Sequence, residues 1–158
     1  MLETINSTKT IDVPSDAVWT AVAGVGGIDR WLPLIESCRV EGRGEGALRF
    51  LRIAGGGEIE DRVDEIDHQR RRFRYTRTRS PFPVKNYVGT VEVRPAPKDR
   101  SEVSCTVDID VAPEAKDEMV ALLSGALSDL ISGIEREVQQ EAASRGGRFH
   151  RMAKEACQ

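Results

Sequence analysis

The strongest constraint on the fold of this chain is a change in the spacing of its hydrophobic residues near Pro113. Between residues 37 and 109 hydrophobic side chains recur at every second position, and breaks rich in glycine, proline and charge divide the region into about six segments. Such alternation is typical of strands with one buried face. After Pro113 the spacing is helical, with an apolar stripe of Met119, Leu122, Leu123, Ala126, Leu130, Ile134 and Val138. The sequence therefore predicts an antiparallel meander followed by one long amphipathic helix.

The region before residue 37 predicts one further strand and two short helices. Hydrophobic side chains of one parity between residues 3 and 13 indicate an edge strand, which ends at Pro14. Helical spacing follows over residues 18–22 until a cluster of glycines, and a second short helix fits residues 28–32. The predicted order is thus a strand, two helices, a six-stranded meander and a long helix.

The length of the chain fits one domain. Of its 158 residues, 39% are hydrophobic and 31% charged, which is the balance of a globular protein. We expect the domain to span residues 1–143, because Gly146 and Gly147 interrupt the helical pattern. Residues 144–158 are expected to form a C-terminal tail or a short extra helix.

The sequence lacks the features that membrane-spanning, exported and metal-binding proteins usually show. No segment is apolar enough to span a bilayer, and residues 1–10 lack the basic flank and apolar run of an export signal, so we expect a cytoplasmic protein. Three widely spaced cysteines and two distant histidines, His68 and His150, do not match the usual spacing of metal ligands. We therefore expect neither a bound metal nor a cofactor.

Five short segments punctuate the predicted elements: residues 11–19 (IDVPSDAVW), 31–33 (WLP), 44–49 (GEGALR), 61–67 (DRVDEID) and 83–87 (PVKNY). Their order resembles that in the START and pollen-allergen-like superfamily, also called SRPBCC, and in its polyketide cyclase/dehydrase and lipid-transport branch. The resemblance spans about residues 9–138. It implies an α+β helix-grip fold, in which a seven-stranded curved antiparallel sheet wraps around a long C-terminal helix and two short helices follow the first strand.

The implied fold leaves a cavity between the sheet and the long helix, because a curved sheet cannot press all of its inward side chains onto one helix. Strand parity and the resemblance together predict its lining, which consists of Phe50, Ile59, Asp61, Tyr75, Arg77, Tyr87, Leu123, Leu127 and Leu130. Arg52 joins this set, although the alternation of its strand can be read with either face inward. Tyr75 and Tyr87 would offer a flat surface to an aromatic ligand, or would be ordinary core residues.

Asp61 and Arg77 carry charge on strand faces that are otherwise apolar. Because a lone buried charge is costly, one interpretation is that they pair across the cavity and orient a polar group of the ligand. The other interpretation places one or both at the cavity mouth, in water. They are also the candidate catalytic residues, with Asp61 as general acid or base and Arg77 stabilising developing enolate charge.

Residues 68–91 carry seven basic side chains and no acidic one, although the whole chain has a net charge of −3. Arg72 and Arg74 alternate with Phe73 and Tyr75, which is typical of the solvated outer face of a sheet. We therefore do not expect nucleic acid as a partner. The expected partner is a small hydrophobic molecule, and the sequence is compatible with a homodimer.

Three functions remain open on these grounds. The first is the binding or transport of a small hydrophobic molecule, lipid-like or polyketide-like and in part aromatic, which requires only a shaped apolar cavity. The second is a polyketide cyclase/dehydrase-type enzyme that uses Asp61 as acid or base. The third is a protein-interaction module comparable to the co-chaperone members of the superfamily.

Overall fold

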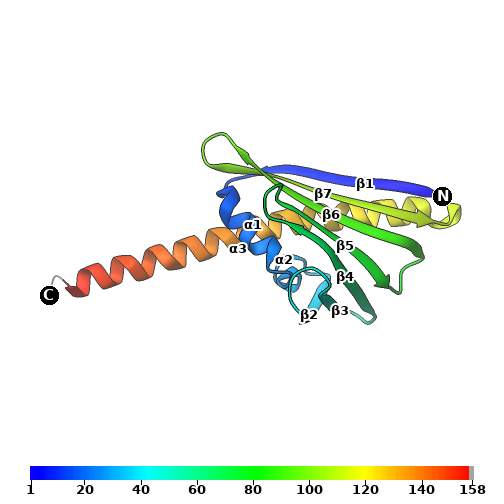
Figure 1. Ribbon diagram of the computed structural model, residues 1–158, viewed down its shortest axis with the longest axis horizontal. Coiled ribbons are helices and arrows are strands. Elements are labelled where there is room, and N and C mark those ends of the chain that lie inside the picture. Colours follow the sequence, from blue (N-terminus) through cyan, green and yellow to red (C-terminus); the bar gives the residue numbers. More distant parts are fainter. Residues whose placement is uncertain (157–158) are drawn as a thin grey trace.

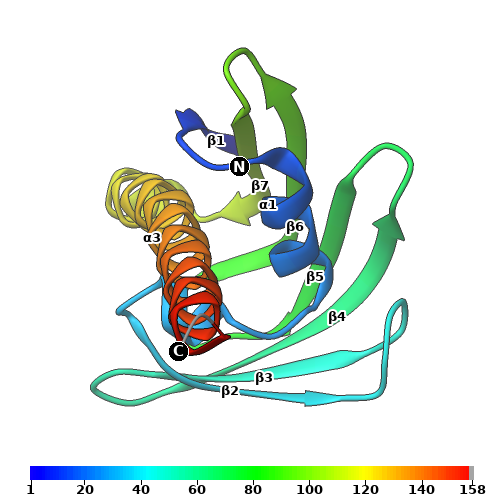
Figure 2. The same ribbon diagram turned by 90° about the vertical axis from the view of Figure 1, so that its left-hand side faces the viewer.

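The alternating segments form one seven-stranded sheet within the described part of the chain, which comprises the backbone of residues 1–156 and the side chains of residues 1–145. In the computed structural model the strands are β1 (Leu2–Ile11), β2 (Ile35–Glu41), β3 (Leu48–Ile53), β4 (Glu58–Asp67), β5 (Arg72–Arg79), β6 (Val84–Ala96) and β7 (Arg100–Val111). Each pairs antiparallel with its neighbours in the order β1-β7-β6-β5-β4-β3-β2. Figure 2 shows how strongly the sheet curves.

The helices occupy the concave side of this sheet. α1 (Ser15–Ala23) and α2 (Ile28–Trp31) follow β1, and the 3₁₀ turn η1 (Pro113–Ala115) leads from β7 into α3 (Lys116–Ala156). Figure 1 shows α3 passing along the sheet, with α1 and α2 near the end from which its C-terminal part projects. No helix among the described residues combines the length and hydrophobicity needed to cross a bilayer. The predicted α+β helix-grip fold is confirmed.

The strand faces that alternation predicted to be buried are buried. In β7, Val103, Cys105, Val107 and Ile109 are each at most 2% exposed, while the residues between them lie on the outer face. The same alternation holds along β4, β5 and β6. The inward faces of these strands therefore supply one wall of the core, and α3 supplies the other.

Helix α3 is longer than the sequence predicted. Its backbone stays helical through Gly146 and Gly147, so the expected break at this pair is wrong. A glycine inside a helix costs only about 1 kcal/mol relative to alanine, which good helix formers on either side can offset. The division into a domain of residues 1–143 and a segment of residues 144–158 stays a prediction. The side chain of His150 and all of Cys157 lie outside the described residues.

A close backbone approach fixes α2 against α3. Gly133 of α3 lies against Trp31, and a Cβ at position 133 would stand 2.0 Å from the Trp31 carbonyl oxygen. The indole Nε1 of Trp31 and the guanidinium of Arg30 both donate hydrogen bonds to the Glu137 carboxylate, one turn further along α3. These contacts hold α2 and the loop after it over α3, where they cover one side of the space between sheet and helix.

Candidate functional site

A small hollow lies between the concave face of the sheet and α3. Its volume is about 50 Å³, which is room for one or two water molecules at roughly 30 Å³ each. The sequence predicted half of its lining, namely Ile59, Tyr75, Arg77, Tyr87, Leu123, Leu127 and Leu130. The rest comes from α2 and the loop after it, the start of β2, the β5–β6 loop and α3, and consists of Ile28, Leu32, Leu34, Ile35, Phe82, Leu122 and Ala126.

Three residues of the predicted lining do not line the hollow. Asp61 is fully buried beside it, and Phe50 and Arg52 lie on the opposite face of the sheet. Leu51 and Ile53 of β3 are buried in the core, so the residues that alternate with them point outward. Phe50 packs there under Arg39, whose Cζ is 4.3 Å from the ring centroid, and Arg52 is exposed. The prediction that Phe50 and Arg52 line the cavity is therefore wrong, because the inward face of β3 is the one that carries Leu51 and Ile53.

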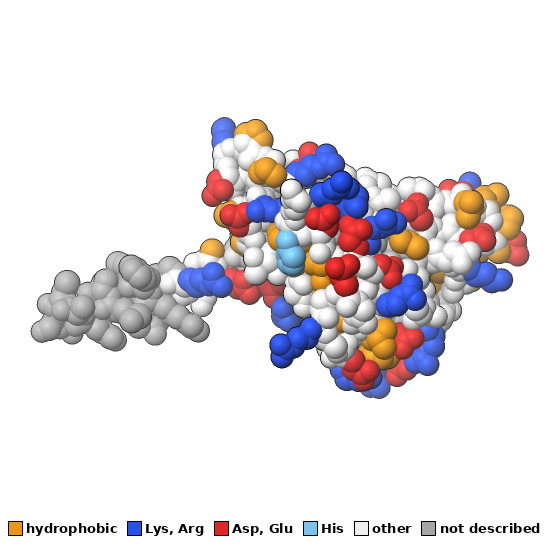
Figure 3. Space-filling model, in the orientation of Figure 1, with side chains coloured by type: hydrophobic (Ala, Val, Ile, Leu, Met, Phe, Trp, Pro, Cys, Tyr) orange, Lys and Arg blue, Asp and Glu red, His pale blue; other side chains and the backbone are white. Residues whose placement is uncertain are grey.

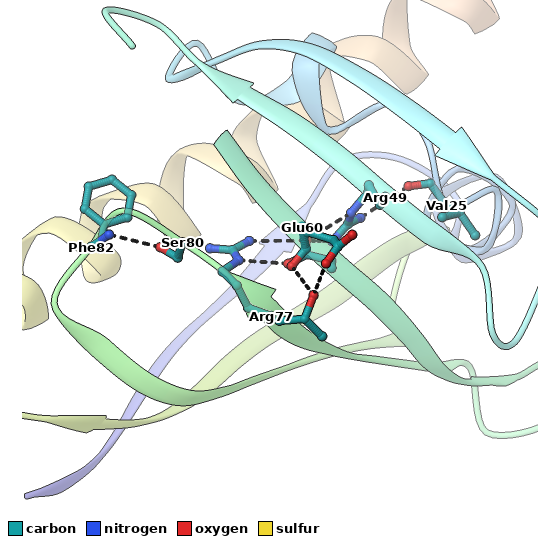
Figure 4. Close-up of polar contacts among 8 residues, drawn as sticks. Val25, Arg49, Glu60, Arg77, Ser80 and Phe82 are labelled. Atoms are coloured by element: carbon teal, nitrogen blue, oxygen red, sulfur yellow. Dashed lines mark hydrogen bonds and ion pairs between the residues drawn. The ribbon is translucent and has the colours of Figure 1, made fainter. Parts of the chain in front are cut away.

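Asp61 and Arg77 form an ion pair, as one interpretation of the sequence predicted, but as direct neighbours on β4 and β5. Arg77 Nε donates to Asp61 Oδ1 over 2.8 Å, and Nη2 donates to Oδ2 over 3.3 Å. Arg49 on β3 donates to the same carboxylate, with its Nη2 and Nε 2.9 and 3.2 Å from Oδ2. Figure 4 shows the side chains of Arg49 and Arg77 extending toward one another from their strands. Arg49 Nη1 donates to the Val25 carbonyl oxygen. Asp61 is thus enclosed between two arginines, with none of its surface exposed.

The carboxyl group of Asp61 is held in its ionised form. Burial alone would raise its pKa, but the positive charges of Arg77 and Arg49, with the hydrogen bonds that both donate, lower the pKa below its ordinary value. Both of its oxygens accept hydrogen bonds from the arginines. A carboxylate that is ionised, enclosed and bonded in this way is poorly suited to exchanging protons with a ligand. Its geometry is that of a structural counter-ion.

Arg49 is the member of this cluster that sequence reasoning missed. It is buried, it shares the inward parity of Leu51 and Ile53, and it stands opposite Asp61 in the β3–β4 register. The sequence did contain a signal for Arg49. It is a basic residue on the inward parity of its strand, and an inward aspartate lies on the next strand, which favours a pair between them. That signal is lost when Phe50 is placed inward, because a shift of one residue turns Arg49 outward.

Tyr75, Tyr87 and Arg77 form one wall of the hollow. The two ring centroids are 6.1 Å apart, and Arg77 lies over Tyr87 with its Cζ 4.2 Å from the ring centroid. A guanidinium at this distance is attracted to the face of the ring, which helps to hold Arg77 in place. Burial raises the pKa of Tyr75 well above its ordinary value, so its phenol stays protonated. The polar groups of this wall can therefore all donate hydrogen bonds.

The sheet opens on its outer side next to this wall. The pairing of β5 with β6 ends at Thr76 and Val88, and beyond these residues the strands separate around a groove of about 550 Å³. Asn86 has a left-handed backbone, with a φ of 55°, where the β6–β7 register shifts beside this groove. Arg77 and Tyr87 line both the groove and the hollow. The groove and the hollow therefore adjoin at these two side chains.

The hollow also has an apolar mouth. Leu32, Leu34, Leu122 and Ala126 line both the hollow and an external groove of about 340 Å³ between α3 and the loop after α2. Because these residues line both spaces, the external groove adjoins the hollow on this side. Phe82 adds an aromatic ring from the β5–β6 loop. An apolar molecule can therefore approach the hollow along apolar side chains.

The arginine-rich segment is largely neutralised by acids on neighbouring elements. Five of its arginines form ion pairs within the described residues, which are Arg70–Asp67, Arg71–Asp16, Arg72–Glu65, Arg77–Asp61 and Arg79–Glu58. In Figure 3, Lys and Arg side chains are interspersed with Asp and Glu over the displayed face. The segment therefore offers less free positive charge than its composition indicates.

The thiols of the described residues are not reactive centres. Cys105 is enclosed in the core, where burial raises the pKa of its thiol to about 12. Burial also raises the pKa of the half-buried Cys38. A nucleophilic cysteine needs the opposite shift. Among residues 1–145, no group of three His, Cys, Asp or Glu side chains is placed to hold a metal ion.

The sequence matches a known protein family, and the fold is shared with solved structures. The model of one protein family, described as polyketide cyclase/dehydrase and lipid transport, matches residues 3–139. No curated protein matches the chain significantly in sequence. The family match covers the whole sheet, α1, α2 and the part of α3 that lines the hollow.

Three solved structures illustrate the likeness. A protein of Bacillus thuringiensis described as uncharacterised shares 23% identity and a TM-score of 0.77, with 87% of this chain and 99% of that chain covered. A protein of Thermobifida fusca shares 27% identity and a TM-score of 0.76, with 87% and 93% covered. Norcoclaurine synthase from Thalictrum flavum, solved in complex with dopamine and hydroxybenzaldehyde, shares 20% identity and a TM-score of 0.74, with 89% and 88% covered. At such identities the likeness establishes a shared fold.

Proposed function

The chain belongs to the polyketide cyclase/dehydrase and lipid-transport family, and on this premise we propose that it binds a small hydrophobic molecule in the hollow between the sheet and α3. The observation that carries the proposal is the composition of the lining. One of the lining residues, Arg77, is charged, two are tyrosines, and the others are apolar. Sites for small molecules are typically apolar, with a few polar groups that fix the orientation of the ligand.

The hollow has to widen to accept such a molecule, because about 50 Å³ is well below the roughly 300–1,000 Å³ of ordinary ligand sites. The β5–β6 loop is the part best placed to move. Phe82 N donates to Ser80 Oγ, and Val84 N at the start of β6 donates to the Phe82 carbonyl oxygen, so Phe82 is bonded only to residues two positions away along the chain. Displacing Phe82 therefore breaks no ladder bond between strands, and such segments open at low cost.

A small aromatic molecule is one ligand class that this site would suit. Norcoclaurine synthase, which shares the fold, was solved with dopamine and hydroxybenzaldehyde bound. In this chain Tyr75 and Tyr87 would pack against such a ring from the sheet, and Leu123 and Leu127 would cover it from α3. The apolar mouth would accommodate an aliphatic tail, which extends the class to lipid-like and polyketide-like molecules.

The alternative of a polyketide cyclase/dehydrase-type enzyme with Asp61 as acid or base has weaker support. Asp61 is fully buried, ionised and paired with two arginines, and it lies behind the lining. An enzyme at this site would have to rely on Arg77 and the tyrosines to stabilise developing negative charge. The protein-interaction alternative and the homodimer stay predictions.

Two measurements test the proposal. Native mass spectrometry of freshly purified protein should reveal a copurified small molecule, and calorimetric titration should detect binding of a neutral apolar probe, 2-naphthamide. Ala126→Trp places an indole in the mouth and should abolish binding of the probe. Ala142→Trp, at an exposed position of the same helix outside the hollow, is the matched control and should bind as the wild type does. Equal binding by both variants would place the probe elsewhere and contradict the proposal.

A further inference from the structure

We infer that the ligand of the hollow is a monoanion, an apolar body that carries one carboxylate, and that Arg77 holds the carboxylate. This inference rests on the proposed function and specifies the ligand of the same site. It follows from three features of the described residues: the charge of the buried cluster, the donors left without a partner, and the apolar character of the remaining lining.

The buried cluster carries one uncompensated positive charge. It contains the guanidinium groups of Arg49 and Arg77 and the single carboxylate of Asp61. The side chains of the arginines are only 5% and 9% exposed, so water screens their charge weakly. Among the described residues, Asp61 is the only acid in an ion pair with either arginine. A buried charge without a counter-ion is costly, and one negative charge on a ligand would remove that cost.

Arg49 and Arg77 differ in how their donors are used. Arg49 has all three nitrogens bonded, two of them to Asp61 and the third to the Val25 carbonyl oxygen. Arg77 uses Nε and Nη2 for Asp61, and its Nη1 makes no hydrogen bond to a described residue. Arg77 therefore keeps one hydrogen-bond donor available to an anion. It is also the one charged residue in the described lining of the hollow.

The tyrosine hydroxyls strengthen this asymmetry. Neither Tyr75 nor Tyr87 hydrogen-bonds through its hydroxyl to another described residue. Every polar side-chain atom that is fully enclosed in the described part of the chain has a partner, so the two hydroxyls are not fully enclosed. The two hydroxyls and Arg77 Nη1 are therefore within reach of a water-sized molecule. Arg77 Cζ lies 4.2 Å from the Tyr87 ring centroid and 5.8 Å from that of Tyr75, so the guanidinium lies close to both rings.

A carboxylate fits this arrangement because it has two acceptor oxygens, carries one charge and has no donor of its own. A neutral amide or alcohol would leave the cluster charge uncompensated, and a dianion such as a phosphate monoester would overcompensate it. The rest of the ligand has to be apolar, since the remaining lining and the mouth at Leu122 and Ala126 are apolar. The ligand class is thus an aromatic or aliphatic monocarboxylic acid.

The test compares probes of equal shape and different charge. 2-Naphthoate and 2-naphthamide, together with decanoate and decanamide, are titrated calorimetrically into the full chain at neutral pH. Each carboxylate should bind at least about tenfold more tightly than its amide, as expected for a charge-assisted hydrogen bond in an enclosed site. Equal affinities within a pair would overturn the inference and leave the proposed function standing. Failure of all four probes to bind would overturn both.

Arg77→Gln is the decisive variant because it leaves the Arg49–Asp61 pair intact and removes the uncompensated charge. The preference for each carboxylate over its amide should disappear, so that the two members of a pair bind within about threefold of each other, and a preference that persists would contradict the inference. If Arg77→Gln does not fold, as judged by circular dichroism, the double variant Arg49→Gln/Asp61→Asn takes its place. It keeps Arg77 as the sole buried charge and should retain the carboxylate preference, whose loss would contradict the inference.

Two controls separate the hollow from the outer groove, which Arg77 also lines. Lys85→Gln removes a basic residue of the groove and should leave naphthoate affinity unchanged. Ala126→Trp blocks the mouth of the hollow and should abolish naphthoate binding. Binding that survives Ala126→Trp but is weakened by Lys85→Gln would place the anion in the outer groove, which overturns the inference.

Discussion

Gly89 of β6 stands opposite Tyr75 of β5, and the phenol ring of Tyr75 occupies the space that a side chain at position 89 would fill. A Cβ on Gly89 would lie 2.2 Å from Cζ and 2.4 Å from the hydroxyl oxygen of Tyr75. The ring can lie flat against β6 only because position 89 has no side chain. The Tyr75 wall of the hollow therefore depends on a glycine that does not itself line the hollow.

Gly89→Ala should displace Tyr75 from the sheet toward α3. Since the hollow is only about 50 Å³, the displaced ring would fill it and overpack its lining, at a cost of about 1–3 kcal/mol in the free energy of unfolding. Urea denaturation measures this loss, and titration with 2-naphthamide should show loss of binding. Unchanged stability and binding would mean that Tyr75 can adopt a second position at no cost.

Asp61→Asn should be strongly destabilising, because it leaves the guanidinium groups of Arg49 and Arg77 buried without a counter-ion. Removing one partner of a buried pair costs about 3–5 kcal/mol of unfolding free energy. Asp110→Asn is the matched control. Asp110 pairs with the terminal amine of Met1 at the surface, where solvent screens the pair, so little change is expected. Chemical denaturation at neutral pH distinguishes the two variants.

The same carboxylate predicts a pH dependence. Because the two arginines lower the pKa of Asp61 in the folded chain below the unfolded value of about 3.9, the cluster contributes full stability above that pH. This contribution is lost as the pH falls through the folded pKa, since the carboxylate then becomes protonated. Denaturation midpoints measured between neutral and strongly acidic pH should fall less steeply below about pH 4 for Asp61→Asn than for the wild type. Parallel curves would assign the acid sensitivity to other carboxylates.

Much of the fold was predictable from local periodicity. Along β7 hydrophobic residues occupy one parity and polar ones the other, so only one face can be buried. The β3 sequence, with Phe50 on one parity and Leu51 and Ile53 on the other, is apolar on both faces. In the structure Leu51 and Ile53 are buried and Arg49 pairs with Asp61 on the next strand, a contact that the spacing of residues within β3 does not reveal.

The length of α3 and the size of the hollow were less accessible to sequence reasoning, for different reasons. Gly146 and Gly147 weaken a helix without forbidding it, so neighbouring residues decide whether it continues. The volume of the hollow is the small remainder after large side chains such as Tyr75 and Tyr87 have packed, and rotamers set it. Strand parity predicts which side chains face the helix and gives no measure of the space between them.

Gly133→Ala should lower stability, although alanine is the better helix former by about 1 kcal/mol. The new methyl group would stand 2.0 Å from the Trp31 carbonyl oxygen, so α2 would have to lift from α3 and strain its hydrogen bonds to Glu137. Gly125→Ala is the control on the same helix, where a Cβ meets nothing within 4 Å, and it should be neutral or stabilising. The midpoint of thermal unfolding should therefore fall for Gly133→Ala and stay unchanged or rise for Gly125→Ala. An unchanged or higher midpoint for Gly133→Ala would show that α2 does not depend on this approach.

Phe82→Ala and Phe50→Ala together test which phenylalanine controls access to the hollow. Both rings are half-buried, but Phe82 lines the hollow from the β5–β6 loop while Phe50 packs under Arg39 on the outer face of the sheet. If ligand entry requires displacement of Phe82, its removal should speed the association of 2-naphthoate several-fold in stopped-flow experiments, because the rate of such entry is set by the opening of the loop. Phe50→Ala removes an equal ring outside the hollow and should leave the association rate at its wild-type value. An acceleration by Phe50→Ala, or none by Phe82→Ala, would mean that the probe does not enter past the β5–β6 loop.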